Sequence, residues 1–112
     1  SIRVDLEIGF SDLTPQYLRE LSFMKPFGVG NPKPVFLTRG VRTKRTPESL
    51  GSNGLRWWVT DGVMTFEALW RSRGPQLLFP AREPYAIAYS PKLKSWDGID
   101  CLTLEVRDVK AD

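Results

Sequence analysis

Cationic and tryptophan side chains occur together in two parts of this sequence, where they could bind a polyanion that carries flat bases. Lysine and arginine attract phosphate, and an indole ring stacks on any base because every base has a π face. The candidate phosphate ligands are Arg42, Lys44, Arg45, Arg56, Lys92 and Lys94, and the candidate stacking residues are Trp58 and Trp96. This interleaving favours single-stranded nucleic acid as a ligand.

The positive charge is concentrated in one segment. The net charge is +3, but residues 33–60 hold six basic residues against one acidic residue. A run such as Arg42–Arg45 is by default a solvated loop, and the local imbalance makes a patch that binds a polyanion an equally good interpretation.

The four tryptophans divide by their register in the predicted strands. Trp57 and Trp70 fall on the apolar alternating positions and are expected in the core. Trp58 has the opposite register, so it is either an exposed interface residue or a second core contact. Trp96 adjoins a turn, where it either covers one end of the sheet or stacks on a base.

Patterns for catalysis and metal binding are weak. Histidine is absent, which excludes histidine general bases, Ser–His and Cys–His dyads and histidine metal ligands. The carboxylates near each end of the sequence lack Asp-x-Asp or EF-hand spacing, so solvated strand faces and turns explain them better. The GVGN run has no Lys-Ser/Thr after it, which disfavours a nucleotide-binding loop. We therefore expect no catalytic residue, metal or cofactor in this segment.

Length and composition bound the class of protein. A chain of 112 residues with 41% hydrophobic and 26% charged residues has the composition of one globular domain. It has no apolar run of about 18 residues and no secretory pattern, so we expect a cytoplasmic protein with no membrane partner. The single cysteine, Cys101, favours a reducing compartment and, within an alternating apolar run, is expected to be a buried core residue.

The elements that would position these side chains begin with an N-terminal unit, residues 1–34. Alternating apolar residues predict a half-buried strand over residues 2–8. Thr14 as a cap and Pro15 at the first helical position predict a helix over residues 15–23. The connector PFGVGNPKP follows, and we interpret it as a rigid joint rather than a DNA contact. Its structural positions are Pro26, Phe27, Gly28, Gly30, Asn31 and Pro32.

Residues 35–112 hold five strand patterns. Asp61-Gly62 and Asp97-Gly98 each have the two-residue pattern of a type I′ turn, so each predicts a hairpin. The run TKRTPESLGSNG predicts a polar loop. Five strands with one irregular connection fit a mainly β, five-stranded Greek-key barrel of the oligonucleotide-binding (OB) type, although an SH3-like barrel or a sandwich fragment shares much of this pattern. An OB barrel binds single strands on one face and in two flanking loops.

One segment resembles a known family. Residues 21–36, LSFMKPFGVGNPKPVF, resemble the L-x-P-F-G-x-G-N-x-x-P-x-F motif that precedes the C-terminal OB domain of RecJ-type single-stranded-DNA-specific exonucleases. Only the distance from the leucine to the proline differs. Runs within residues 61–68 and 86–109 also look like strands of that domain, so the similarity spans nearly the whole chain.

The resemblance implies a parent enzyme, a hydrolase among the DHH phosphoesterases. Such an enzyme degrades single-stranded DNA from 5′ to 3′ with Mn²⁺ or Mg²⁺ in bacterial recombination and repair. Its metal-binding Asp and His motifs lie in upstream domains, and a chain without histidine cannot hold them. For this segment the resemblance implies two partners, single-stranded DNA and the catalytic domains of the parent, and single-strand-binding protein is a further candidate.

Two hypotheses follow for the segment itself. In the first, it is a non-catalytic OB module that holds single-stranded DNA for the exonuclease through the cations and tryptophans given above. In the second, it docks on the catalytic domains without touching DNA, through a face that includes Trp58 and Phe23. The second hypothesis predicts an exposed apolar patch.

Overall fold

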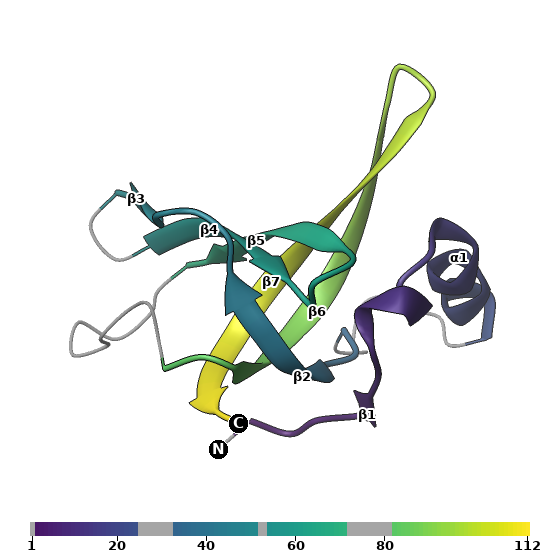
Figure 1. Ribbon diagram of the computed structural model, residues 1–112. Coiled ribbons are helices and arrows are strands. Elements are labelled where there is room, and N and C mark those ends of the chain that lie inside the picture. Colours follow the sequence, from purple (N-terminus) through teal and green to yellow (C-terminus); the bar gives the residue numbers. More distant parts are fainter. Residues whose placement is uncertain (1, 25–32, 52–53, 72–81) are drawn as a thin grey trace.

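Figure 1 shows the computed structural model, which describes residues 2–24, 33–51, 54–71 and 82–112. The chain begins with the strand β1 (Leu6–Glu7), the 3₁₀ helix η1 (Phe10–Asp12) and the helix α1 (Pro15–Met24). The remaining strands are β2 (Phe36–Thr43), β3 (Glu48–Leu50), β4 (Gly54–Thr60), β5 (Thr65–Trp70), β6 (Tyr85–Trp96) and β7 (Ile99–Ala111). The predicted mainly β class, with little helix, is confirmed.

The strands form one seven-stranded sheet in the order β1-β2-β6-β7-β5-β4-β3. The pairs β1–β2 and β5–β7 are parallel, and the other pairs are antiparallel. An additional pairing joins β2 to β4 through Arg42 with Thr60 and Thr43 with Val59. Hydrogen-bonded neighbours therefore run from β2 through β6, β7, β5 and β4 and back to β2.

Side chains on the inner face of these strands form the hydrophobic core. On β4 the strand alternation turns Leu55, Trp57 and Val59 inward, and all three are buried. Trp57 packs against Trp70 of β5, with ring centroids 6.2 Å apart. Trp57 and Trp70 are only 1% and 7% exposed, so the prediction that both are core residues is confirmed.

The N-terminal unit adds to the same core. The Thr14 hydroxyl accepts a hydrogen bond from the Tyr17 backbone N–H at 3.1 Å, which is the expected N-cap of α1. Phe10 is fully buried and meets the rings of Phe66 and Tyr89 edge-on, with centroids 5.1 and 6.2 Å away. The predicted helix is confirmed, and it extends by one residue to Met24.

The predicted N-terminal strand over residues 2–8 is mostly wrong. Only Leu6 and Glu7 form a strand, and they pair with Phe36 and Leu37 at the start of β2. The apolar side chains of Ile2, Val4 and Leu6 are exposed rather than half-buried. β1 lies at the edge of the sheet, so its alternation does not bring these side chains onto the core.

The two predicted hairpins both exist, but only one has the predicted turn. Trp96 pairs with Ile99, and both Asp97 and Gly98 have positive φ, 51° and 77°, as a two-residue type I′ turn requires. The other loop is longer, because Thr60 pairs with Thr65 and leaves residues 61–64 between them.

The Asp61 side chain explains the longer loop. Its Oδ1 accepts hydrogen bonds from the backbone N–H groups of Val63 at 2.9 Å and Met64 at 2.8 Å. These bonds lower the pKa of Asp61, the bond from Met64 having the larger effect. An aspartate that bonds its own following backbone builds a local turn of this kind, and it displaces the two-residue turn predicted from the Asp-Gly pair.

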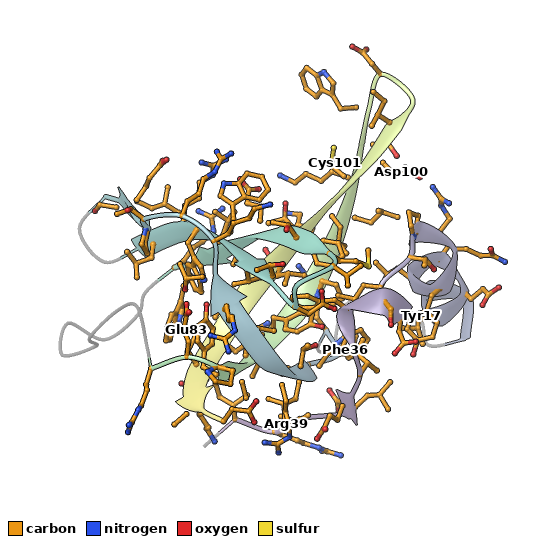
Figure 2. All side chains as sticks on the ribbon, in the orientation of Figure 1. Tyr17, Phe36, Arg39, Glu83, Asp100 and Cys101 are labelled. Carbon is orange, nitrogen blue, oxygen red and sulfur yellow. The ribbon has the colours of Figure 1, made fainter. Side chains whose placement is uncertain are left out.

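Two further expectations are corrected. The run predicted to be a polar loop contains β3, which pairs with β4. Cys101, predicted to be buried, is exposed on β7 opposite Lys94 of β6. Figure 2 shows Cys101 on the long β6–β7 hairpin, which extends beyond the other strands. The alternating apolar residues around Cys101 therefore predicted a strand correctly, but the core does not cover the side chain of Cys101.

Candidate nucleic-acid interface

Cross-strand pairing places side chains from four strands in one row on the outer face of the sheet. Trp58 of β4 pairs with Glu67 of β5, Glu67 with Thr103 of β7, and Thr103 with Lys92 of β6. Directly paired residues have their side chains on the same face. The sheet therefore presents Trp58 and Lys92 on one surface, although 34 positions of sequence separate them.

A shallow hollow lies at the Trp58 end of this row. Its volume is about 150 Å³, and its lining residues are Lys44, Arg45, Trp58 and Thr65. The Lys44 backbone N–H donates to the Trp58 carbonyl at 2.9 Å, which continues the β2–β4 pairing and sets Lys44 beside the indole. Trp58 is half-buried. We call this feature the Trp58 hollow.

Arg56 lies against the indole and is not among the residues that line the hollow. Its guanidinium carbon is 5.4 Å from the centroid of the Trp58 ring. Its Nε donates to Glu67 at 2.5 Å, and another nitrogen lies 3.5 Å from Glu48. The hydrogen bond to Glu67 raises the pKa of Arg56 above its ordinary value. Arg56 therefore holds the indole in place, and its charge is already balanced by carboxylates.

Arg42 also has a carboxylate partner. It lies 3.7 Å from Glu83, whose other oxygen accepts the Thr43 backbone N–H at 2.6 Å. Its pairing with Thr60 keeps it on the outer face, but Arg42 is not among the residues that line the Trp58 hollow.

Ion pairs also hold two of the other four cations of residues 33–60. Lys33 bonds Glu105 at 3.0 Å, and Arg39 bonds Glu7 at 3.2 Å. Figure 2 shows Arg39 and Asp100 at opposite ends of the molecule. Within the described residues, Lys44 and Arg45 are the cations of this segment that have no ion pair. Four of the six cations of this segment therefore form ion pairs, and the two that have no ion pair in the described residues lie at the Trp58 hollow.

Lys92, Lys94 and Trp96 lie at alternate positions of β6 and share one face. They follow the last residue of β6 that pairs with β2, Tyr89. Beyond Lys92 and its partner Thr103, β6 and β7 continue as a two-stranded ribbon, residues 93–102, which Figure 1 shows projecting from the sheet. Trp96 is 76% exposed near its tip. The alternative that Trp96 covers one end of the sheet is therefore wrong.

The helix α1 is tied to this ribbon. Arg19 of α1 forms an ion pair with Asp100 of β7, and the Ser95 hydroxyl donates to the same carboxylate at 2.7 Å. The hydrogen bond from Ser95 and then that from Arg19 lower the pKa of Asp100. Ser95 and Asp100 are cross-strand partners, so this carboxylate lies on the other face of the ribbon from Lys94 and Trp96.

Sequence reasoning missed Thr65 and Glu67 as parts of this surface. Both lie on the outward register of TFEALW, opposite the buried Ala68 and Trp70, so the alternation contained the signal. The predicted joint (Pro26, Phe27, Gly28, Gly30, Asn31 and Pro32) and the side chain of Phe23 lie outside the described part of the chain.

The described residues hold neither a metal-binding cluster nor a membrane-spanning helix. No group of three or more histidine, cysteine or acidic side chains there is placed to hold a metal ion. In the same residues, no helix has the length and apolar character needed to cross a bilayer.

The mainly β architecture, with one seven-stranded sheet, is consistent with the class of OB-type domains. The family model of the RecJ OB domain matches residues 4–108, and the chain belongs to this family. No curated protein matches it.

Two solved structures from Thermus thermophilus are similar. RecJ in complex with Mg²⁺ has 26% sequence identity and a TM-score of 0.65 over 96% of this chain and 16% of that chain. RecJ in complex with Mn²⁺ has 26% identity and a TM-score of 0.61 over 88% of this chain and 14% of that chain. This chain therefore spans a small part of the length of these relatives.

Proposed function

We propose that this chain is the single-stranded-DNA-binding module of a RecJ-type 5′-3′ exonuclease of DNA recombination and repair. In this proposal the ring of paired strands is a five-stranded Greek-key OB barrel, which follows the N-terminal unit of residues 1–34. The observation that supports it best is the alignment of Lys44, Trp58 and Lys92 on one outer face.

The Trp58 hollow suits one nucleotide. Arg56 lies over the indole from outside the hollow, so a base stacks on the part of the ring that faces the hollow. Lys44 and Arg45 neutralise the adjoining phosphates, because neither is held by a carboxylate in the described part of the chain. Stacking and phosphate contacts need no particular base, so the module binds single strands without sequence preference.

The hydrolytic chemistry belongs, in this proposal, to other domains of the parent protein. The relatives named above were crystallised with Mg²⁺ and Mn²⁺. This chain has no histidine, and its described carboxylates do not form a set of ligands for such an ion. The module holds the strand while cleavage takes place elsewhere, and single-strand-binding protein is a further proposed partner.

Fluorescence anisotropy with a labelled oligothymidylate tests the proposal. Trp58→Ala should weaken binding about 5- to 150-fold, the range for losing one stacked base. Replacing Lys44 and Arg45 by alanine should flatten the log–log salt dependence by about 1.4, since each phosphate contact on a single strand contributes about 0.7.

The matched control replaces Arg3 and Lys110 by alanine. It also removes two exposed cations, but neither lines the Trp58 hollow, so the salt slope should stay near that of the parent chain. Circular dichroism confirms that each variant is folded. Absence of binding by the parent chain at low salt would reject the proposal.

A second candidate function is docking on the catalytic domains. The exposed side chains of Ile2, Val4 and Leu6 supply an apolar stripe outside the Trp58 hollow. A groove of about 130 Å³ adjoins it, with walls that include Ile2, Val4, Leu37 and Ala88. This patch is consistent with a docking role, although it lies elsewhere than the predicted face around Trp58.

Titration calorimetry against separately expressed catalytic domains tests the docking function. Val4→Glu should abolish the heat of binding while leaving oligonucleotide affinity unchanged, because Val4 lies outside the Trp58 hollow. Unchanged calorimetry with this variant would exclude the stripe as the docking surface.

A further inference from the structure

Four free cations of the outer face lie beside an indole, in two groups. Lys44 and Arg45 adjoin the Trp58 hollow. Lys92 lies on β6 at the base of the ribbon, and Lys94 lies on the ribbon itself. None of the four has an ion pair within residues 2–24, 33–51, 54–71 and 82–112. Each group has its own exposed or half-buried indole, Trp58 or Trp96.

The surface between the two groups carries carboxylates. Glu67 lies in the row that joins Trp58 to Lys92, and Glu105 follows two residues after Thr103 on β7. Burial raises the pKa of Glu105, but the hydrogen bond from Lys33 and the charges around it outweigh this effect, and the net pKa is lowered. Glu67 is paired with Arg56, and Glu105 with Lys33. The row between Trp58 and Lys92 holds only Glu67 and Thr103, so this row offers no free cation to a phosphate.

The register fixes the separation of the two indoles. Trp58 and Lys92 are three strand spacings apart, about 14 Å at about 4.8 Å per spacing. Trp96 lies four residues further along β6, another 14 Å or so at about 3.4 Å per residue. Because these directions are roughly perpendicular, the path between the indoles along the surface of the sheet is on the order of 20 Å.

The ribbon presents its indole next to a two-residue turn. Trp96 pairs directly with Ile99, which is also largely exposed, and the intervening turn has only two residues. The ion pair of Arg19 with Asp100 ties the ribbon to α1. A base that stacks on Trp96 therefore meets a platform already held in position, and Lys94 lies two residues away on the same face to take a phosphate.

We infer that the outer face holds two separate nucleotide subsites, one at the Trp58 hollow and one at the ribbon tip, rather than one continuous groove. The ligand class is single strands long enough to reach both. At about 3.4 Å per stacked nucleotide, about six nucleotides span the separation. This inference rests on the proposed function. It adds that a strand must have a minimum length, about six nucleotides, to reach both subsites.

Anisotropy with oligothymidylates of three, six, nine and twelve nucleotides tests the inference. A trinucleotide reaches one subsite only, so affinity should rise abruptly between three and nine nucleotides, by about 5- to 150-fold for the added stacked base. Trp96→Ala should remove this rise and leave binding of the trinucleotide nearly unchanged. Trp58→Ala should weaken the trinucleotide as well.

Val63→Ala is the matched control, because Val63 is an exposed apolar residue at the tip of the other hairpin. It should preserve the abrupt rise. A rise that is gradual in the parent chain, or unchanged in Trp96→Ala, would overturn the two-subsite inference while the proposed function stands. No binding of the twelve-nucleotide strand at low salt would instead overturn both.

Discussion

Neutralising Glu67 should strengthen binding of single-stranded DNA. Its carboxylate accepts hydrogen bonds from Arg56 at 2.5 Å and from the Thr103 hydroxyl at 3.1 Å. Glu67→Gln keeps the size of the side chain and an oxygen for Thr103, but it removes the charge that balances Arg56. The guanidinium, 5.4 Å from the centroid of the Trp58 ring, then becomes available to a phosphate beside the stacked base.

The size of the effect follows from the ion pairs. The four cations beside the two indoles, Lys44, Arg45, Lys92 and Lys94, have no ion pair in the described residues, and four phosphate contacts predict a log–log salt slope of about −2.8 at about −0.7 per phosphate on a single strand. Release of Arg56 adds a fifth contact and makes the slope about −3.5. Glu48 still faces Arg56 at 3.5 Å, but its side chain is 70% exposed and screened by solvent.

The assay is anisotropy with a nine-nucleotide oligothymidylate at five salt concentrations. Glu20→Gln is the matched control, because it removes one negative charge from α1, outside the row of paired residues, and should leave the slope unchanged. If the log–log salt slope of Glu67→Gln equals that of the parent chain, or is shallower, the idea that Glu67 keeps Arg56 from binding phosphate is refuted.

The remaining predictions concern stability. The buried hydroxyls of Thr38 and Tyr89 share a hydrogen bond of 2.7 Å. Thr38→Val and Tyr89→Phe should each lower the free energy of unfolding in urea by about 1–3 kcal/mol, and the double variant by less than the sum, since it leaves neither hydroxyl without its partner. Simple additivity would contradict the buried bond. Burial holds the pKa of Tyr89 above its ordinary value, so its contribution is complete below about pH 10 and falls as the pH rises further. Urea titrations between about pH 9 and 11 should show a steeper loss in the parent chain than in Tyr89→Phe. Thr14→Ala removes the cap on the Tyr17 N–H and should cost about 1 kcal/mol, whereas Thr14→Ser should cost less; equal losses would exclude the cap.

Local patterns predicted the strands and the side chains that face the core. In LRWWVT the period of two separates Trp57 from Trp58, and the structure buries the first and leaves the second half-buried on the outer face. The Asp97-Gly98 turn was also predictable, because only a few residue pairs tolerate two consecutive positive φ angles. These features depend on neighbours in sequence.

Features that depend on distant neighbours could not be predicted. Arg42 and Arg39 belong to the most basic segment of the chain, yet their carboxylate partners Glu83 and Asp112 lie 41 and 73 positions away. Counting charges along the sequence therefore overestimated how many cations are free. The wrong prediction that Cys101 is buried has the same cause. Its alternating pattern predicts a strand, but burial of the side chain depends on whether other strands extend as far as β6 and β7 do.

The ion pairs also bear on how such a module works. Cations that join strands stabilise the sheet but contribute little to DNA affinity, so a domain with only four free cations beside Trp58 and Trp96 in its described part should bind a single strand weakly and with strong salt dependence. If the module is joined to catalytic domains that also hold the strand, as proposed, weak binding suffices because the second contact is intramolecular and has a high effective concentration. Weak contacts also release quickly, which an exonuclease needs if the strand is to move past the module as it is shortened. Glu67 fits this reasoning, because a carboxylate that keeps Arg56 from phosphate would limit affinity on the surface where, in this proposal, the strand slides.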